Sequence, residues 1–397
     1  MTVRIEKPAI NVREELADLR KPTGIAGEAM LRAETPQEQF NLIGAGRRNL
    51  IINGAMQVAQ RGTSFDPQGT GNGEGYTVDR FAWVRRETTG SGFTFDATIT
   101  QDTDSPSGLD KSLKVVADTA QSTLSGSENA LITTKFEGQD LQRFGWGSSN
   151  ANPLTLSFWV KSNKTGTYCV QTRYNNSNDS GLFEYSVSAS GTWEYKTIAI
   201  PANTSISFNS NNTLEMEIIF HLAVGPDDIR AASSNVGTSN FRATSNQVNL
   251  FDAASNYWQI TGVQLELGKV ATPFEHRSYG EELALCQRYY QKLPFTGSGY
   301  QFTATHVGGG SWRSAVRLTV PMRAVPTVST NYSSATNDLE FIDGGSTINV
   351  SSISGAFGQN EHLINFNGSL ASSPSGNAAV LYQRQQNTWY AEVDAEL

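Results

Sequence analysis

Two glutamates on one predicted strand are the chain's candidates for acid–base chemistry. Glu215 and Glu217 stand two residues apart in a run whose other members are apolar, and this spacing places both carboxylates on the same face of a strand. Carboxyl groups held ~5–9 Å apart can hydrolyse a glycosidic bond. A solvated strand face produces the same alternation and is the more common outcome, so the pair by itself does not indicate an enzyme.

A glycine-rich stretch raises the alternative of phosphate binding. Its glycines alternate with other residues at Gly69, Gly71, Gly73 and Gly75. A phosphate loop requires a helix that begins directly after the glycines, usually with a lysine followed by serine or threonine. Residues 76–81 follow here in a strand pattern and contain no lysine. We therefore interpret the stretch as a loop.

Histidine and cysteine offer little for metal or nucleophilic chemistry. The chain contains four histidines, His221, His276, His306 and His362. They are widely separated and none has another histidine four residues away, which favours structural roles over a metal site or a catalytic triad. Cys169 and Cys286 are the two cysteines, too few for a disulfide scaffold or a cysteine zinc site. We expect no cofactor and assign no metal ligand.

Aromatic side chains are the most informative group for binding. An outward tryptophan or tyrosine on a polar strand can stack on the apolar face of a sugar while neighbouring amides bind its hydroxyl groups. The candidates are Trp159, Tyr300, Trp312 and Tyr332. The first lies between two residues expected to face a core, the third follows three glycines, and the tyrosines lie near polar loops. For each of them, a partly buried core or rim position is the alternative.

The composition describes an ordered and mildly acidic chain. A chain of 397 residues is long enough for two or three domains with real cores. Its 30 basic and 38 acidic residues give a net charge of −8, which argues against nucleic-acid binding because that function requires a basic face. No apolar run reaches the ~20 residues that span a bilayer, so we expect no membrane insertion.

Residues 1–47 differ from the rest and are predicted to form a short α-helical arm. Charged residues account for 15 of the first 48 positions. Apolar residues at helical spacing in this arm include Val12, Leu16, Leu19, Met30, Leu31 and Phe40. Isolated helices shorter than ~12–15 residues are marginal in water, so these residues must be covered either by the rest of the chain or by other copies of it. We favour an arm for oligomerisation or docking.

Residues 48–277 are predicted to form an antiparallel β-sandwich. Apolar and polar residues alternate with a period of two in many short segments, as in 153–161, where Leu154, Leu156 and Phe158 are expected to point inward. Loops rich in Asn, Ser and Gly separate these segments, and no helical pattern lies between them. Strands in such succession indicate two antiparallel sheets packed face to face.

A helix and a third region complete the predicted organisation of a mainly β protein. Ser278 to Glu281 has the S-x-x-E form of a capping box, which predicts a connecting helix over 278–293 that ends before Pro294. Residues 294–397 again alternate with a period of two and are divided by Asn-Asp, Gly-Gly and Gln-Asn turns. This pattern predicts a second, smaller β-sandwich.

Several landmarks are spread along the chain, namely residues 48–62 (RNLIINGAMQVAQRG), 76–81, 146–147, 155–162, 260–268, 271–275, 286–290 (CQRYY) and 394–397 (DAEL). Together they resemble bacteriophage tail fibre proteins that carry a carbohydrate-binding-module-like domain. Residues 31–46 are also similar to the small-residue helix and glycine turn that precede many tail fibre domains. The resemblance covers nearly the whole chain, although residues 294–397 match only at their ends.

The resemblance implies a jelly-roll adhesin that is not an enzyme, is usually a homotrimer and resides in the tail of the virion after assembly in the host cytoplasm. Residues 1–47 would attach it to tail adaptor or nozzle proteins, and residues 294–397 would form a receptor-binding tip for a host surface polysaccharide. Related sandwiches often hold a structural calcium, for which we assign no ligands.

Two other functions remain open at this point. One is a tailspike-like enzyme that degrades glycans, which new reducing ends after incubation with host polysaccharide would reveal. The other is a virion adaptor or decoration protein without a receptor role. Binding of a chain lacking residues 1–48 to host cells would separate an adhesin from this second alternative.

Overall fold

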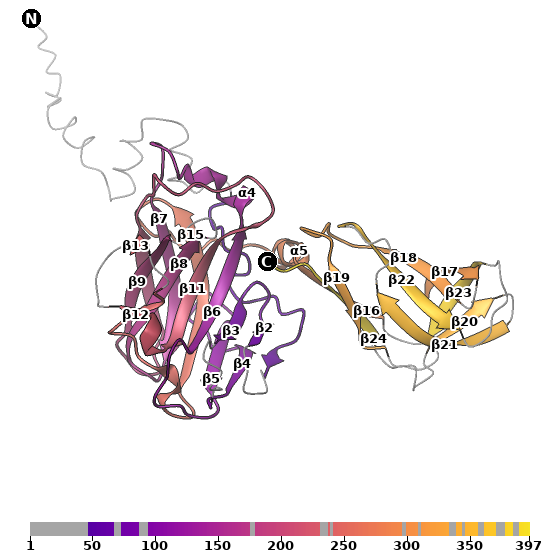
Figure 1. Ribbon diagram of the computed structural model, residues 1–397, viewed down its shortest axis with the longest axis horizontal. Helices are drawn as coiled ribbons and strands as arrows, with labels where there is room; N and C mark the ends of the chain where they lie inside the picture. Colours follow the sequence, from indigo (N-terminus) through magenta and orange to yellow (C-terminus); the bar gives the residue numbers. More distant parts are fainter. Residues whose placement is uncertain are drawn as a thin grey trace, which may run out of the picture. The chain divides into compact units, whose positions relative to one another are not determined.

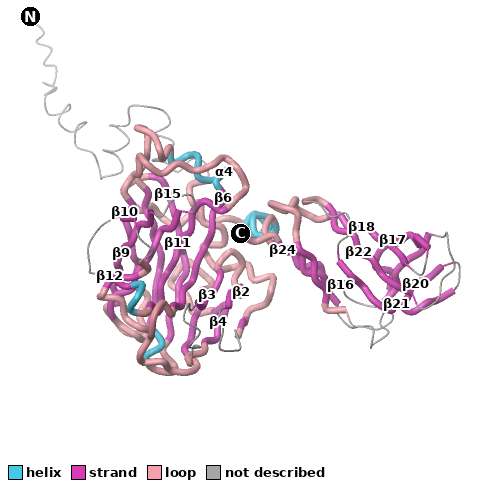
Figure 2. Tube along the Cα trace, in the orientation of Figure 1, coloured by secondary structure: helices cyan, strands magenta, loops and turns pink. Residues whose placement is uncertain are grey.

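The computed structural model describes residues 47–66, 73–86, 94–174, 179–230, 237–238, 241–295, 299–308, 311–332, 339–343, 346–355, 361–370, 378–383 and 389–397. The chain divides into two compact units, Met1–Asn49 and Leu50–Leu397. The predicted arm and its apolar residues Val12, Leu16, Leu19, Met30, Leu31 and Phe40 lie outside the described residues. Every described helix and strand belongs to the second unit, in which strands far outweigh helices (Figure 2).

One large sheet has six strands within the described residues, each antiparallel to its neighbours. In spatial order the strands are β1 (Ser64–Phe65), β4 (Ala97–Asp102), β5 (Ser112–Ala117), β15 (Tyr257–Leu267), β7 (Leu154–Ser162) and β10 (Glu194–Ile200). The pairing of β15 with β7 is interrupted by a bulge between Thr261 and Gln264. Gly262 takes a φ of +61° in this bulge, a left-handed conformation that glycine adopts without steric cost.

The second large sheet has seven strands within the described residues. In spatial order they are β13 (Gly237–Thr238), β9 (Asp179–Val187), β8 (Gly166–Tyr174), β11 (Leu214–Val224), β6 (Asn129–Glu137), β3 (Ala82–Arg86) and β2 (Gly73–Tyr76). The smaller elements are α4 (Gly138–Leu141), three 3₁₀ turns (Gln142–Phe144, Pro226–Asp228, Leu250–Asp252) and the parallel pair β12 (Ile229–Arg230) and β14 (Ala243–Thr244). Figure 1 shows β9, β8, β11, β6 and β3 side by side.

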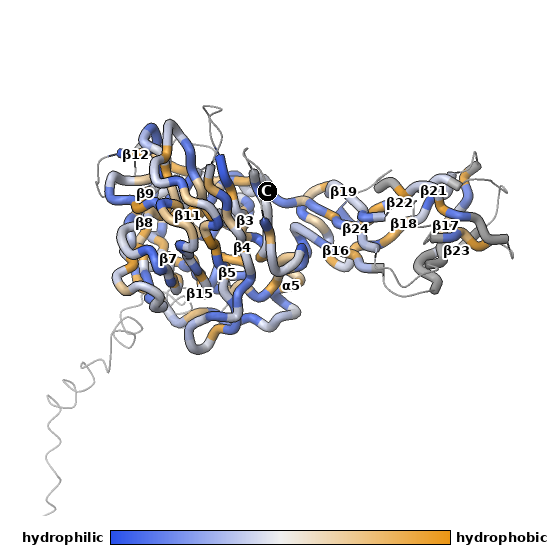
Figure 3. The backbone as a smooth tube through the Cα atoms, turned by 90° about the horizontal axis from the view of Figure 1, so that it is seen from below, coloured by the Kyte–Doolittle hydropathy of each residue, from blue (hydrophilic) through white to orange (hydrophobic). Residues whose placement is uncertain are grey.

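A single hydrophobic core lies between these two sheets. Leu154, Leu156 and Phe158 of β7 are fully buried in it, as their alternation with polar residues predicts. The ring of Phe158 meets those of Tyr185 and Phe220 edge to face, with centroids 5.1 and 5.2 Å apart. Burying one such side chain contributes ~1.5–3 kcal/mol. The alternation of hydrophilic and hydrophobic residues along the strands is visible in Figure 3, and the predicted antiparallel β-sandwich is confirmed.

The connecting helix α5 (Tyr279–Gln287) begins where the sequence predicts it. The hydroxyl oxygen of Ser278 accepts from the backbone N–H of Glu281, and the carboxylate of Glu281 accepts from the backbone N–H of Ser278 at 2.9 Å. Each of the two residues thus satisfies a donor that the first helical turn leaves free.

The predicted end of this helix is wrong, because a strand begins three residues after Gln287. This strand, β16 (Tyr290–Phe295), pairs with β24 (Trp389–Asp394), which also pairs with β19 (Thr327–Thr330). The strand order β16-β24-β19 leaves β16 at the edge of the sheet. An edge strand tolerates a residue without an N–H, so Pro294 lies within the strand and does not terminate a helix.

The rest of the C-terminal region closes into a barrel, which corrects the expectation of a second sandwich. Its strands, in order around the barrel, are β17 (Gly299–Gly308), β18 (Ser311–Arg317), β22 (Leu363–Leu370), β21 (Ser346–Gly355), β20 (Leu339–Asp343) and β23 (Ala378–Gln383). Because β23 pairs with both β17 and β20, the sheet meets itself and has no free edge. The side chains of Trp312, Phe341 and Phe366 fill the barrel core.

Charged and aromatic residues join the sandwich to the end of the chain. We call Arg61, Arg80, Tyr289, Tyr290 and Glu396 the junction cluster. The guanidinium carbon of Arg61 lies 3.5 Å from the ring centroid of Tyr290, and that of Arg80 lies 3.4 Å from the centroid of Tyr289. Both arginines form ion pairs with Glu396, which keeps the charge of Arg80 compensated although only 3% of this residue is exposed.

Candidate functional site

Of the two tyrosines predicted to bind glycan, the structure describes the side-chain contacts of Tyr332 and only the strand position of Tyr300. Tyr300 lies on β17 opposite Tyr382, and its side chain is outside the described part of the chain. Tyr332 is half-buried, donates its hydroxyl hydrogen to the carbonyl oxygen of Val350 at 2.6 Å and meets Trp389 edge to face with centroids 6.5 Å apart. These contacts match the alternative of a core-rim aromatic for Tyr332.

Trp312 faces the inside of the barrel and has no exposed ring face. Its relative exposure is 0%, and the residue opposite it on β22 is Gly368. A Cβ atom at Gly368 would lie 1.9 Å from the indole Nε1, so only glycine leaves room for the ring. The expectation that Trp312 presents an outward stacking surface is therefore corrected: the ring is a packing element of the barrel.

Trp159 is the predicted aromatic residue that the structure places on an outer surface. Its neighbours Phe158 and Val160 are fully buried, so the indole points out of the sandwich from the six-stranded sheet. Tyr195 of β10 lies directly opposite it, with ring centroids 5.3 Å apart and planes inclined by 52°. Trp159 is half-buried, and 43% of Tyr195 is exposed. The two inclined rings form a small, partly exposed apolar patch on the outer face of the sheet.

Asp104 fixes a third aromatic residue beside this pair. The indole N–H of Trp193 donates to Asp104 Oδ1 at 3.1 Å, and Lys161 Nζ donates to Oδ2 at 2.5 Å. Burial opposes ionisation of Asp104, but the hydrogen bonds from Lys161 and Trp193 outweigh it and lower the pKa of this carboxyl. The Lys161 ammonium also lies 6.0 Å from the Trp193 ring centroid. We call Trp159, Trp193 and Tyr195 the aromatic platform.

The sequence analysis did not find Trp193, Tyr195 or Asp104. Tyr195 belongs to β10, Trp193 directly precedes that strand and Asp104 lies in a loop that follows β4. The pairing of β10 with β7 brings Tyr195 opposite Trp159. The available signal was the position of Tyr195, which stands an odd number of residues from the inward Ile198 and Ile200. A single outward aromatic residue forms a larger apolar surface only when a second aromatic residue lies opposite it on the neighbouring strand.

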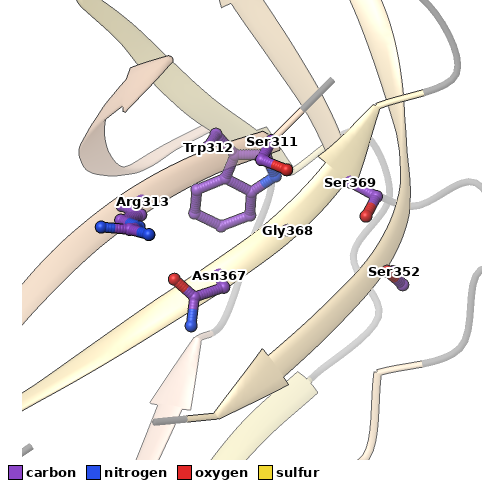
Figure 4. A pocket seen from close by; sticks show the side chains of 7 residues that line it. All are labelled: Ser311, Trp312, Arg313, Ser352, Asn367, Gly368 and Ser369. Atoms are coloured by element: carbon purple, nitrogen blue, oxygen red, sulfur yellow. The ribbon is translucent and has the colours of Figure 1, made fainter. Parts of the chain in front are cut away.

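A polar pocket of about 240 Å³ lies on the barrel. Ser311, Trp312, Arg313, Ser352, Asn367, Gly368 and Ser369 line it. Figure 4 shows these residues on three neighbouring strands, with the side chains of Arg313 and Asn367 on one side of the Trp312 ring and the serines on the other. Hydroxyl, amide and guanidinium groups therefore dominate its wall.

The paired glutamates are buried and engaged with different partners. Glu217 forms an ion pair with Arg173 at 2.5 Å, and Glu215 accepts from the side-chain amide of Asn209 at 2.9 Å. Their residues are 4% and 2% exposed, so the expectation of a solvated strand face is wrong. A bulge between Leu214 and Met216 separates them in the β11–β6 register. Their partners identify them as internal salt-bridge and hydrogen-bonding groups of the second sheet.

His221 is a fully buried ionisable group on the second sheet. Its Nε2 lies 3.1 Å from Gln171 Oε1. Burial, assisted by the positive charges of Arg242 and Arg173, lowers the pKa of His221 to about 3. The imidazole is therefore neutral in the folded chain at neutral pH and serves packing.

The described ranges contain neither a metal-binding cluster nor a membrane-spanning helix. No group of three or more His, Cys, Asp or Glu side chains there is arranged to hold a metal ion. None of the helices in the same ranges is long and apolar enough to cross a membrane.

Comparisons with known proteins give only weak structural likenesses. No family model and no curated protein matches the chain. A solved structure of the enzymatically active domain of tailspike protein 4 from bacteriophage CBA120 is similar over 55% of this chain and 21% of its own, at 13% identity and a TM-score of 0.29. The chain thus spans about a fifth of that structure.

Two carbohydrate-binding modules are similar at the same level. A family 61 module in complex with beta-1,4-galactotriose matches 56% of this chain and all of its own, at 9% identity and a TM-score of 0.26. The family 11 module of a Clostridium thermocellum cellulosomal cellulase matches 52% of this chain and all of its own, at 10% identity and a TM-score of 0.25. These values are too low to support a functional argument, and the fold assignment follows from the strand topology itself.

Proposed function

We propose that this chain is a glycan-binding structural protein of the bacteriophage tail fibre type. The observation that carries the proposal is the aromatic platform. Trp159 and Tyr195 leave part of their rings uncovered on a sheet whose core needs neither of them. Apolar rings flanked by fixed polar groups are the arrangement that binds the apolar faces and hydroxyl groups of a sugar.

The groups around the platform suit an uncharged sugar ring. Asp104 and Lys161 are paired with each other, so their charges are largely compensated. Both still have polar atoms at the edge of Trp193. A sugar stacked on Trp159 or Tyr195 could exchange hydrogen bonds with these groups without bringing an ion of its own.

The attachment part of the proposal rests on the sequence resemblance. In this proposal residues 1–47 gather three copies and dock them on a tail adaptor or nozzle protein. Three weak sites on one fibre would then act together, and such multivalency commonly raises apparent affinity by 10²–10⁴-fold, as an order of magnitude. The chain would work in the virion, with a host surface polysaccharide as its receptor.

Binding by the full chain to an array of purified bacterial surface polysaccharides tests the proposal. Trp159→Ala should weaken binding to the strongest glycan about tenfold or more, because it removes the central ring of the platform. Tyr279→Ala is the matched control, since it removes another exposed aromatic, 57% exposed, at the start of α5. Equal binding by both variants, or no binding to any polysaccharide, would contradict the proposal.

The same preparation tests whether the protein binds without cleaving. We propose that it has no glycosidase activity, since Glu215 and Glu217 are buried and engaged with separate partners. Incubation with the bound polysaccharide should produce no new reducing ends. Reducing ends that disappear in Glu217→Gln would overturn this part and favour the tailspike-like enzyme.

A further inference from the structure

We infer that the aromatic platform binds a run of at least two consecutive neutral sugar rings that lies along strands β7 and β10, and not a single terminal sugar. The inference rests on the proposed function and deepens it, because it assigns the ligand a minimum length and a direction on the sheet. It is carried by the uneven cover of the outer face of the six-stranded sheet and by the position of Trp193.

The outer face of β15 is covered, whereas the outer face of β10 is open. The residues of β15 that point away from the core are at most 1% exposed, namely Gln259, Thr261, Gln264 and Glu266. The residues of β10 that point to the same side are all exposed, namely Tyr195, Thr197 and Ala199. Because β7 lies between these two strands, a ligand can reach this face over β10 and β7 but not over β15.

Two loops, residues 103–111 and 268–277, lie over β15, and we call them the loop wall. The hydroxyl of Thr261 donates to the carbonyl oxygen of Lys111 at 2.6 Å. The backbone N–H of Glu275 donates to Gln264 Oε1 at 2.8 Å. These hydrogen bonds hold both loops against the sheet, so the loop wall bounds the platform on the side away from β10.

Gly262 brings the loop wall up to Trp159. A Cβ atom at Gly262 would lie 2.9 Å from Leu109 Cδ1, 3.1 Å from Trp159 Cδ1 and 4.0 Å from Phe274 Cδ2. Each loop thus places one apolar side chain near the Cδ1 atom of this indole. A glycan that crossed the strands from β10 would meet the loop wall directly beyond Trp159, after a single aromatic step.

Along the strands, in contrast, the platform offers two successive aromatic positions. The rings of Trp159 and Tyr195 are 5.3 Å apart and inclined by 52°, close enough to contact the same sugar ring. Trp193 precedes Tyr195 by two residues, which corresponds to about 6.6 Å along a strand. Its hydrogen bond to Asp104 places it on the same outer face. A second sugar ring can therefore contact Trp193 while the first occupies the Trp159–Tyr195 position.

The polar groups beside Trp193 suit the hydroxyl groups of this second ring. Asp104 accepts from both Trp193 and Lys161, and 41% of its side chain is exposed. A carboxylate has about four acceptor sites, so it can bind a sugar hydroxyl as well as these two donors. Because Asp104 and Lys161 compensate each other in charge, the position matches a neutral ring.

A fragment series tests the minimum length. The probes are the monosaccharide, disaccharide and trisaccharide obtained by partial hydrolysis of the polysaccharide that binds most strongly in the array. In ligand-observed NMR with the full chain, the disaccharide should bind about tenfold more tightly than the monosaccharide, or more, since a second ring adds stacking and hydrogen bonds. Equal affinities of the monosaccharide and the disaccharide would overturn the inference.

Trp193→Ala tests the position of the second ring. It should lower the affinity of the disaccharide to that of the monosaccharide and leave the monosaccharide unaffected, because a single ring occupies the Trp159–Tyr195 position. Trp193→Phe keeps a ring and should retain most of the affinity, and Tyr279→Ala is the control with an exposed aromatic removed elsewhere. Wild-type affinity for the disaccharide in Trp193→Ala would overturn the inference.

Thr197→Trp tests the direction while keeping every residue of the platform. Thr197 is the next outward residue of β10 after Tyr195, and the small Ser157 lies opposite it. The added ring should raise the affinity of the trisaccharide about threefold or more, without affecting the monosaccharide. Ser186→Trp, at an exposed position of β9 in the other sheet, should give no gain. No gain in Thr197→Trp, or an equal gain in both variants, would overturn the direction and the inference with it.

Trp159→Ala separates this inference from the proposed function, because it should lower the affinity of all three fragments. If it does so while Trp193→Ala and Thr197→Trp leave every affinity unchanged, the proposed function holds and the inference fails. If Trp159→Ala has no effect, or no fragment and no polysaccharide binds, both fail.

Discussion

The sandwich and the barrel both cover the apolar faces of their strands, but the core of the sandwich contains many more of the described residues than the core at the barrel. The sandwich packs two large sheets against each other and buries Trp83, Trp258 and many aliphatic side chains in one core. The barrel closes on itself and shares a smaller core with the three-stranded sheet, to which Trp312 of β18 and Trp389 of β24 both contribute. The sandwich can therefore leave Trp159 outside, whereas Trp312 and Trp389 are both buried.

This difference determines which side chains each region presents at its surface. The outer face of the sandwich offers aromatic rings, with Tyr195 43% exposed. The outer wall of the barrel offers serine, asparagine and arginine side chains around a pocket. The chemistry of each surface thus follows from what its core requires. Three substitutions test, in turn, the junction cluster, the core of the sandwich and the helix that connects the two regions.

Breaking the junction cluster has the largest expected effect. Glu396→Ala removes the carboxylate that pairs with the buried guanidinium of Arg80. Breaking a buried ion pair by removing one partner costs about 3–5 kcal/mol, because the remaining charge stays buried without compensation. Urea denaturation at pH 7, followed by tryptophan fluorescence, should show a loss of this size in the free energy of unfolding.

Asp110→Ala, which removes an exposed carboxylate from a loop of the sandwich, is the control and should leave the transition unchanged. If Glu396→Ala costs less than about 1 kcal/mol, the range of an exposed pair, the sandwich does not depend on the end of the chain. The sandwich and the C-terminal region would then be independent in stability.

Acidification probes the sandwich alone. The pKa of His221 is about 3 in the folded chain and ~6.5 in an unfolded one. Between these values the unfolded chain binds a proton that the folded chain does not, so the free energy of unfolding falls as pH falls, by ~1.4 kcal/mol per pH unit. Above pH 6.5 the group has no effect.

Urea denaturation at pH 6.5 and pH 5.0 measures this dependence. Wild type should lose about 2 kcal/mol more than His221→Gln between the two values, since glutamine keeps a donor for Gln171 without titrating near these pH values. Parallel losses in both proteins would mean that the imidazole is protonated inside the second sheet, against its burial and the nearby Arg242 and Arg173.

Removing the cap of α5 has the smallest expected effect and tests the connection between the regions. Ser278→Ala deletes the side-chain acceptor for the backbone N–H of Glu281 and should cost about 1 kcal/mol. Differential scanning calorimetry should show a small decrease in Tm. Ser278→Thr, which keeps the hydroxyl, should restore most of it, and an equal decrease in both variants would show that the cap is not what stabilises the helix.

Local patterns predicted the elements of this fold well. The alternation in 154–160 placed Leu154, Leu156 and Phe158 inward, and the capping box placed the start of α5 at Ser278. Such features depend on residues close together in the chain. The position of Trp312 was predictable in the same way, because it has the same parity as Val316 and Leu318, but its chemical type suggested an outward role.

Long-range pairing accounts for what the sequence did not predict. The end of α5 depends on β24, about a hundred residues further along the chain, which recruits Tyr290–Phe295 into a sheet. Closure of the barrel depends on β23 pairing on both of its sides. The aromatic platform needs Tyr195 opposite Trp159. These features depend on which strands pair in the folded chain, and the local periodicity of a strand does not specify the strand with which it pairs.

The pairing of β16 with β24 has a consequence for replacing the barrel. Phe295 lies directly opposite Trp389, so β16 ends at the rung where β24 begins, and β19 is the described strand between them that also joins this sheet. A segment whose two ends lie one strand spacing apart can be grafted at that rung in place of residues 296–388, provided that it supplies its own cover for the β24 edge that β19 occupies. Replacement at this rung would leave the sandwich, β16 and residues 389–397 unchanged.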